Sequence, residues 1–223
     1  MKPQLLIDLT KTPDGKELVL YERDGVFTIR VDGLELMSSR AHGSEEAMAD
    51  LVLAETSARH PGVLVGGLGM GFTLRSVLDR VSYSSRVTVA ELLPEIVTWN
   101  REHLAGLAGA PLDDPRVELV IDDVSKVMAL RPDAFDAILL DVDNGPAALT
   151  DCRNARLYVA DGLAAIKRSL RRGGFLGVWS ASPDGEYERA LRRAGFRFRV
   201  ETVPARLGAK GPKHTIFVAK VEK

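Results

Sequence analysis

Short runs rich in β-branched and aromatic residues occupy the first part of the chain, and turn signals separate them. The runs cover residues 17–21, 26–31 and 34–37, and the turns fall at residues 23–25 (Arg-Asp-Gly) and 32–33 (Asp-Gly). Asp-Gly between two β-rich runs is typical of a hairpin turn. We therefore predict antiparallel β-hairpins in this region.

A helix is predicted after the hairpins. Ser44 is suited to the N-cap position, and Glu45 and Glu46 follow it, where carboxylates stabilise the positive end of a helix. The helix is expected to run to about Arg59 and to end before Pro61. On this pattern the two glutamates have a purely structural explanation.

From residue 61 onward, apolar strand-like runs alternate with amphipathic segments. Strands are predicted at 63–65, 87–90, 117–121, 135–140, 175–179, 198–203 and 215–221, and helices at 72–80, 94–107, 124–130, 161–171 and 187–194. Such alternation favours an α/β fold with an open, mostly parallel seven-stranded sheet covered on both faces. We expect residues 1–60 to form a β-hairpin extension with a linking helix, and residues 61–223 to form a nucleotide-binding α/β domain.

Composition narrows the class of protein. The 223 residues are 45% apolar, which supports a sizeable core, and the net charge of −1 gives no argument for nucleic acid or an anionic membrane as partner. No apolar run approaches the length of a membrane span. The single cysteine, Cys152, suits a reducing compartment, and the four histidines lack metal-ligand spacing. We expect a cytoplasmic protein without a metal.

A glycine-rich turn follows the first strand of the α/β part. Gly67, Gly69 and Gly71 would let the backbone turn tightly and approach a ligand, and the next helix would offer its positive end. Glu91 ends the second strand, about 20 residues on, where a carboxylate can accept hydrogen bonds from ribose hydroxyls. This pairing indicates a nucleoside site.

Acidic residues also follow the third and fourth strands. Asp122 and Asp123 come after the third strand, and Asp141 and Asp143 after the fourth. Each alone is explained as a cap or turn residue. Because parallel strands end at the same edge of a sheet, their combination with the glycine turn favours a nucleoside donor with reactive groups beside it.

Together with their neighbours, these motifs resemble the spermidine synthase (polyamine aminopropyltransferase) family, of which the chain looks like a short, divergent member. The matching stretches are 67–71 with Thr73-Leu74-Arg75, Ala90-Glu91, 113–116 leading to Asp122-Asp123, 135–138 leading to Asp141, Leu157-Tyr158 and Arg172-Gly173-Gly174. The resemblance runs from about Leu18 to Trp179. It implies the sheet of S-adenosylmethionine-dependent methyltransferases (Rossmann-like), a small-molecule amine or polyamine acceptor, and a homodimer.

The resemblance also implies residue roles. Gly67, Gly69, Gly71, Glu91, Asp122 and Asp123 would bind the donor, which is decarboxylated S-adenosylmethionine or S-adenosylmethionine. Asp141 would be the general base. Apart from the resemblance, we hypothesise from their charge that Asp143, the second candidate catalytic residue, and Glu45 hold a second cationic nitrogen of the acceptor.

Two departures from the family pattern keep other functions open. Met70 stands where the family has an aspartate in the glycine turn, and Glu45 where it has an acceptor-binding tyrosine. Since the family aspartate suits a decarboxylated donor, Met70 favours methyl transfer from intact S-adenosylmethionine as the alternative to aminopropyl transfer. A nucleotide-binding scaffold without transferase activity is the further alternative. Trp179 is expected in the core or pocket wall, and His214 is expected to face water.

Overall fold

The computed structural model describes residues 3–142, 145–146, 154–206, 208 and 211–221. It opens with a four-stranded antiparallel sheet in the order β1-β2-β3-β4. Its strands are β1 (Leu5–Lys11), β2 (Glu17–Arg23), β3 (Val26–Val31) and β4 (Leu34–Ser38). The hairpins at β2, β3 and β4 match the sequence pattern. Strand β1 was not predicted, because most of its side chains are exposed and its sequence shows no buried face.

The seven-stranded sheet has the order β10-β11-β9-β8-β5-β6-β7. Its strands are β5 (Gly62–Gly66), β6 (Arg86–Glu91), β7 (Val117–Ile121), β8 (Phe135–Leu140), β9 (Leu170–Ser180), β10 (Phe196–Pro204) and β11 (Lys213–Val221). Neighbours pair in parallel except β11, which is antiparallel to both β9 and β10. This topology confirms the predicted α/β class with a mostly parallel seven-stranded sheet.

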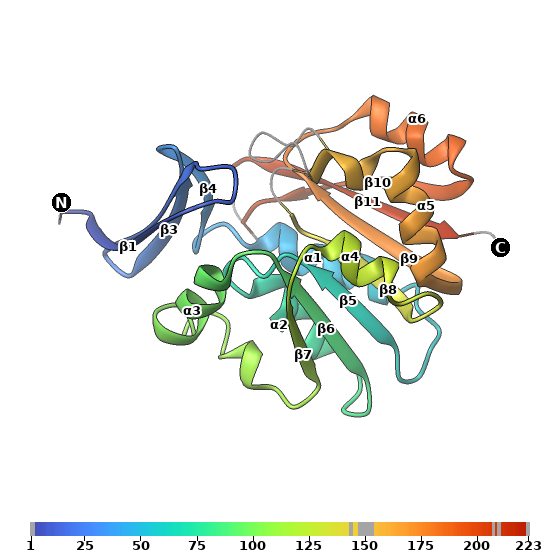
Figure 1. Cartoon of the computed structure of the whole chain (residues 1–223), viewed down its shortest axis with the longest axis horizontal. Coiled ribbons are helices and arrows are strands. Elements are labelled where there is room, and N and C mark those ends of the chain that lie inside the picture. Colours follow the sequence, from blue (N-terminus) through green and yellow to red (C-terminus); the bar gives the residue numbers. More distant parts are fainter. Residues whose placement is uncertain (1–2, 143–144, 147–153, 207, 209–210, 222–223) are drawn as a thin grey trace.

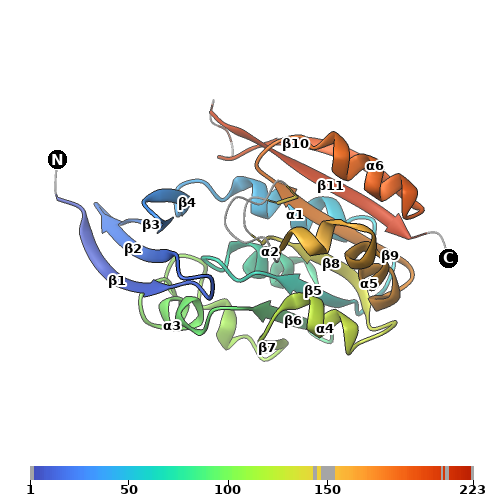
Figure 2. The same ribbon diagram turned by 45° about the horizontal axis from the view of Figure 1, so that its top comes forward.

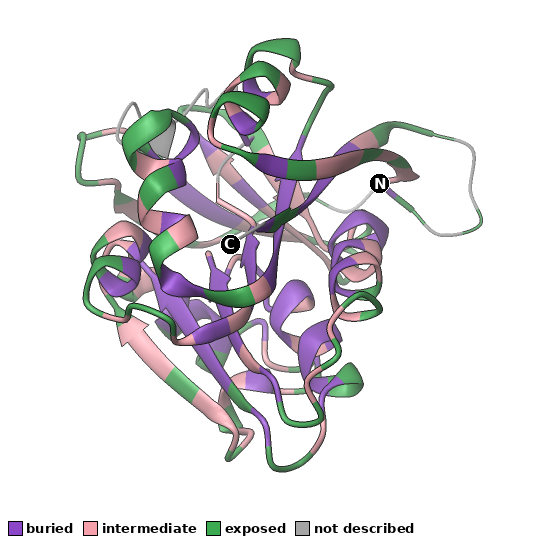
Figure 3. Cartoon of the chain, turned by 90° about the vertical axis from the view of Figure 1, so that its right-hand side faces the viewer, coloured by how far each residue is buried: buried purple, intermediate pink, exposed green. Residues whose placement is uncertain are grey.

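Helices cover both faces of this sheet (Figures 1 and 2). They are α1 (Gly43–Leu53), α2 (Phe72–Arg80), α3 (Pro94–Glu102), α4 (Val124–Ala129), α5 (Ala160–Ser169) and α6 (Gly185–Arg193), with 3-10 turns η1 (Pro111–Asp113) and η2 (Asn154–Tyr158). Residues of α1, α2 and α3 share one buried cluster, and residues of α4, α5 and α6 share the other. Strand side chains alternate between the clusters, so Val63 and Val65 face one and Leu64 the other. Figure 3 shows this buried interior between exposed helix faces.

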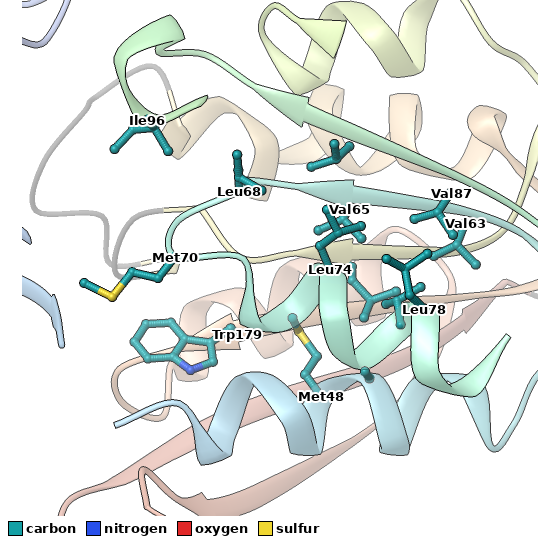
Figure 4. Packing of buried hydrophobic residues seen from close by; sticks show 14 of the residues in the cluster. Met48, Val63, Val65, Leu68, Met70, Leu74, Leu78, Val87, Ile96 and Trp179 are labelled. Atoms are coloured by element: carbon teal, nitrogen blue, oxygen red, sulfur yellow. The ribbon is translucent and has the colours of Figure 1, made fainter. Parts of the chain in front are cut away.

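The first cluster reaches the loop end of the central strands. Figure 4 shows Met48 of α1 near Leu74 and Leu78 of α2, while Met70 and Trp179 lie at the loop end of the strands. All five side chains are at most 9% exposed. The floor of any site at that edge is therefore part of the core.

The small sheet contacts the body of the protein through a hydrogen bond. The indole Nε1 of Trp99, a fully buried residue of α3, donates to Asp8 Oδ2 of β1 at 2.7 Å. Helix α1 packs against α2 and β9. The division into domains at residue 60 stays a prediction.

Several predicted boundaries were wrong. Helix α1 begins at Gly43, with His42 rather than Ser44 at the N-cap, and ends at Leu53. Helix α3 ends at Glu102 rather than 107 because His103 leaves the helical conformation. The Gly173-Gly174 pair was expected to precede the strand but lies within β9, close to a register irregularity with β8. Across the described part of the chain, no helix has the length and apolar character needed to span a membrane.

Candidate functional site

A cavity of about 400 Å³ opens where the carboxyl ends of β5, β6, β7 and β8 face the small N-terminal sheet. Leu18 of β2, Ile29 of β3 and Met37 of β4 contribute to one wall. The cavity lining includes these residues that were predicted from the sequence: Gly67, Gly69, Glu91, Asp122, Asp123 and Asp141. Glu45, Trp179 and His214 line the same space. The cavity has the size and mixed lining of a small-molecule site.

The glycine turn connects β5 to α2, and close packing explains two of its glycines. Gly67 has φ of 87°, and a Cβ there would lie 2.3 Å from the carbonyl oxygen of Asp141. Gly69 has φ of 52°, and a Cβ would lie 2.8 Å from Met37 Cε. At Gly67 the backbone contact excludes a larger residue and keeps the turn close to Asp141, whereas at Gly69 the methionine end can move and the positive φ is what favours glycine.

Gly71 is not among the residues that line the cavity. It occupies the N-cap position of α2 with φ of 85°. A Cβ there would lie 3.1 Å from Asn100 Oδ1. The conformation of Gly71 therefore explains where α2 starts. The predicted role of Gly71 in donor binding stays a prediction.

Asn100 of α3 holds the turn from behind and was not identified from the sequence. This buried side chain donates from Nδ2 to the carbonyl of Gly69 at 2.7 Å and to that of Ile96 at 2.9 Å. The only sign of its role in the sequence was that a polar residue stands four positions after Ile96, on the apolar face of the helix.

Glu91 lies at the end of β6 and is 7% exposed. Its Oε2 accepts from the backbone N–H of Leu68 at 2.8 Å and its Oε1 from that of Leu93 at 2.9 Å. Burial raises the pKa of this carboxyl, and the backbone hydrogen bonds oppose the shift. Each carboxylate oxygen has a second lone pair, which can accept from a ligand hydroxyl.

Asp122 and Asp123 lie after β7. Asp123 caps α4, since its Oδ1 accepts from Ser125 N at 2.8 Å and from Ser125 Oγ at 2.6 Å. Asp122 Oδ1 accepts from Lys126 Nζ at 2.9 Å. The capping explanation therefore applies to Asp123, although both residues also line the cavity.

Asp141 directly follows β8. Its Oδ2 accepts from Thr73 Oγ1, in the first turn of α2, at 2.5 Å. Burial raises its pKa to about 6, and the Thr73 hydrogen bond opposes this shift. Asp143, the second predicted catalytic residue, lies outside the described residues.

Glu45 points into the molecule from the first turn of α1. It is 8% exposed and lines the cavity with Asp141. Burial, and then the charge of Asp141, raises the pKa of Glu45 to about 8, while the hydrogen bond from Ser44 opposes the shift. Its neighbour Glu46 instead contacts His42 Nδ1 at 2.9 Å and is half-buried. The two glutamates, alike in sequence, thus have different environments.

A polar cluster adjoins Glu45. The buried Ser44 hydroxyl donates to Glu45 Oε2 at 2.6 Å, lies 2.8 Å from His214 Nδ1 and accepts from Trp179 Nε1 at 3.0 Å. The rings of Trp179 and His214 meet edge to face with centroids 4.6 Å apart. Trp179 forms pocket wall as predicted, and His214, expected to face water, is half-buried in the lining of the cavity. Among the described residues, no group of side chains could hold a metal ion.

Comparison with known proteins agrees with this architecture. Residues 41–188 match the family described as spermine/spermidine synthase domain. Polyamine aminopropyltransferase 2 of Pseudomonas aeruginosa is 35% identical over 120 residues, which are 52% of this chain and 32% of the relative. Polyamine aminopropyltransferase 2 of Hyperthermus butylicus is 32% identical over 146 residues, 64% of this chain and 45% of the relative. The chain thus spans under half the length of these relatives.

Solved structures show the same fold. A spermidine synthase in complex with the transition state analogue AdoDATO has a TM-score of 0.75 at 20% identity, covering 96% of this chain and 72% of that one. The spermidine synthase from Thermotoga maritima has a TM-score of 0.73 at 22% identity, with the same coverage. From the match over residues 41–188, the chain belongs to the spermine/spermidine synthase family.

Proposed function

We propose that this protein is a transferase that moves an aminopropyl group from decarboxylated S-adenosylmethionine to an amine acceptor. The observation that carries the proposal is the carboxyl pair of the buried Glu45 and the part-exposed Asp141, which lines the same cavity as Glu91 and the glycine turn. Family membership and the names of the curated relatives support it.

The donor half of the cavity suits a nucleoside. Glu91 has lone pairs free for ribose hydroxyls after its two backbone hydrogen bonds. Asp122 and Asp123, at the end of the neighbouring strand, are proposed to accept from the adenine amino group. Gly67 and Gly69 allow the backbone to come close to the donor.

The acceptor half suits a cation. An amine acceptor carries positive charge at neutral pH, and a carboxylate in a desolvated pocket forms a strong charge-assisted hydrogen bond with it. Asp141 and Glu45 offer two such groups, so we propose an acceptor with two cationic nitrogens. Asp143 is proposed to assist.

The reaction needs alignment and one proton transfer. The neutral nitrogen of the acceptor attacks the propyl carbon bonded to sulfur; the carbon–sulfur bond breaks, and its electron pair stays on sulfur. Since an ammonium cannot attack, Asp141 is proposed to remove its proton first. The sulfonium is its own leaving group, so the remaining task of the protein is orientation.

The donor could instead be intact S-adenosylmethionine, with methyl transfer as the reaction. Met70, which is apolar and 2% exposed, is the observation that favours this alternative. Against it, Met70 borders a small recess shared with Glu45 and Asp141. A carboxylate of the donor placed there would meet the negative charge of Asp141, and like charges at short range are unfavourable.

The test compares both donors in the purified chain. Incubation of decarboxylated S-adenosylmethionine with mono-, di- and triamines is expected to yield methylthioadenosine, detected by mass spectrometry, and the diamines or triamines should react best. Asp141→Asn should lower kcat at least 100-fold while calorimetry shows unchanged donor binding. Asp161→Asn, an exposed acid on α5, is the matched control. Turnover with intact S-adenosylmethionine alone would favour methyl transfer, and donor binding without any turnover would favour the scaffold.

Three further proposals accompany this function. We propose that the protein works as a homodimer and in the cytoplasm, as the family resemblance and the cysteine content suggest. Gly71 is proposed to act on the donor only indirectly, by starting α2 at the glycine turn. Sedimentation of the purified chain tests the dimer.

A further inference from the structure

The hydroxyl of Ser44 has three polar neighbours and too few protons to donate to all of them. Trp179 Nε1 can only donate, so one lone pair of Ser44 Oγ is always occupied by the indole. The remaining contacts are Glu45 Oε2 at 2.6 Å and His214 Nδ1 at 2.8 Å. The hydroxyl owns one proton, so it can donate to only one of them and must accept from the other.

This constraint permits two arrangements. When Glu45 is ionised, Ser44 donates to Glu45, and His214 must carry its proton on Nδ1 to donate to Ser44. When Glu45 is protonated on Oε2, it donates to Ser44, Ser44 donates to His214 Nδ1, and neutral His214 carries its proton on Nε2. The ionisation of Glu45 and the tautomer of His214 are therefore coupled through a single hydroxyl.

We propose that Ser44 and His214 form a proton path that carries the proton released by the acceptor from the carboxyl pair Glu45 and Asp141 to the half-buried imidazole in the cavity lining. The proposal rests on the aminopropyl transfer proposed above, which releases one proton per turnover when an ammonium acceptor becomes a secondary ammonium product. The sequence indicated no chemical role for either residue, and the two belong to elements far apart in the chain, α1 and β11.

The atoms of each step balance. Protonated Glu45 gives its proton to Ser44 Oγ while the hydroxyl proton of Ser44 moves to His214 Nδ1. The imidazole then releases its other proton from Nε2 to water. Glu45 is left as a carboxylate and His214 as the neutral Nδ1–H tautomer, which is the other allowed arrangement. The path resets when Asp141 passes the next acceptor proton to the Glu45 carboxylate, and when the imidazole loses its Nδ1 proton to water and regains a proton on Nε2.

The surroundings set the resting state from which the transfer starts, with Glu45 protonated and His214 neutral. Because the pKa of Glu45 is raised and that of His214 is lowered, the step through the imidazolium is uphill and is completed by loss of the Nε2 proton to water. Asp141 faces Glu45 from the end of β8, and Glu46 adjoins it on α1; both add negative charge and favour the protonated form of Glu45. His214 contacts Ser44 of α1 and Trp179 of β9, pairs with Val203 of β10 and is flanked by Lys213. Burial lowers the pKa of His214, so it is neutral and able to accept at Nδ1.

The outer nitrogen is free to exchange its proton. His214 is half-buried, and within the described ranges its Nε2 has no hydrogen-bond partner. By contrast, Ser44 is fully buried. A proton that reaches Ser44 thus leaves through His214 in preference to direct contact with water.

The first test needs no turnover. NMR of the ligand-free chain with ¹⁵N-labelled histidine reports the tautomer of His214, identified by the signal lost in His214→Gln. We expect Nε2–H at neutral pH and Nδ1–H above the pH at which Glu45 ionises, with the change absent in Ser44→Ala and Glu45→Gln. His103, which lies outside the cavity lining, is the internal control. A single tautomer throughout, or a change that persists in Ser44→Ala, would overturn the coupling.

The second test uses turnover. His214→Ala should lower kcat at least tenfold with the acceptor KM unchanged, and added imidazole should restore kcat. Ser44→Ala should show the same loss of kcat, and added imidazole should not restore it. The reason is that this variant interrupts the path between Glu45 and His214, where imidazole cannot replace the missing hydroxyl. If both variants keep kcat within twofold of the parent, the path is refuted while transfer itself stands. A parent chain without turnover refutes the proposed function, and the tautomer measurement still decides the coupling.

Discussion

Replacing Glu45 by glutamine should remove a pH-dependent loss of stability that the buried carboxyl imposes on the fold. The pKa of Glu45 is raised from 4.5 to about 8 in the folded protein, chiefly by burial and then by Asp141. The folded pKa is the higher one, so between these pH values the unfolded chain releases a proton that the folded chain keeps. Stability is therefore full below about pH 4.5 and falls as the pH rises to about 8.

The magnitude follows from the size of the shift. One pKa unit corresponds to about 1.36 kcal/mol, so the change from 4.5 to about 8 amounts to roughly 5 kcal/mol. Because Glu45 and Asp141 titrate as an interacting pair, this figure is an order of magnitude for the pair. A loss of this size is comparable to the whole stability of a marginal domain.

The assay is urea unfolding of the ligand-free chain between pH 5 and pH 9. As the pH rises from 5 to 9, the free energy of unfolding of Glu45→Gln is expected to increase by several kcal/mol relative to that of the parent. This change is expected whatever the difference between the two proteins at pH 5. Glu46→Gln, next along α1 and half-buried beside His42, is the matched control and should follow the parent. A difference between Glu45→Gln and parent that stays constant within about 0.5 kcal/mol would refute the reasoning, because such a carboxyl would impose less than half a pKa unit of linkage.

Three further changes test the site. Gly67→Ala should lower Tm by several degrees, because its Cβ would lie 2.3 Å from the Asp141 carbonyl at a φ of 87°, whereas Gly106→Ala, with open space around it, should change Tm little. Thr73→Val removes a hydrogen bond that lowers the pKa of Asp141, so the rising limb of kcat against pH should move up by about one unit; an unmoved limb would exclude Asp141 as the titrating base. Glu91→Gln should weaken donor binding in calorimetry by about 10- to 100-fold, the value of one or two hydrogen bonds to a charged group, and unchanged affinity would place the ribose elsewhere.

The parts of the fold that local patterns determine were predictable from sequence. Helix α2 and strand β8 have the predicted bounds, because a glycine turn starts the helix and a continuous apolar run fills the buried strand. The convergence of Glu91 and Asp141 on one cavity followed from the rule that parallel strands end at one edge. Strand β1 was missed because it is paired by backbone bonds while its side chains stay exposed.

What could not be predicted depends on partners distant in sequence. Ser44 has the local pattern of an N-cap, yet its hydroxyl contacts His214, which lies 170 residues away. Nothing near position 214 distinguishes a buried histidine from an exposed one. Asn100 likewise shows its role only through a contact with Gly69. Residues that act through tertiary hydrogen bonds carry little signal in a single sequence.

Met70 and Glu45, the two departures from the family pattern, lie beside each other in the structure. Met70 replaces an acid in the glycine turn and Glu45 replaces a tyrosine on α1, and the two side chains border the same recess of about 10 Å³, together with Asp141. A recess of that size holds about one water. For the proposed reaction, Glu45 and Asp141 would then supply the acidic groups beside the donor's tail that the turn itself lacks. Glu45 also interacts with Asp141 and with the Ser44 hydroxyl, so the recess and the proposed proton path share this one residue.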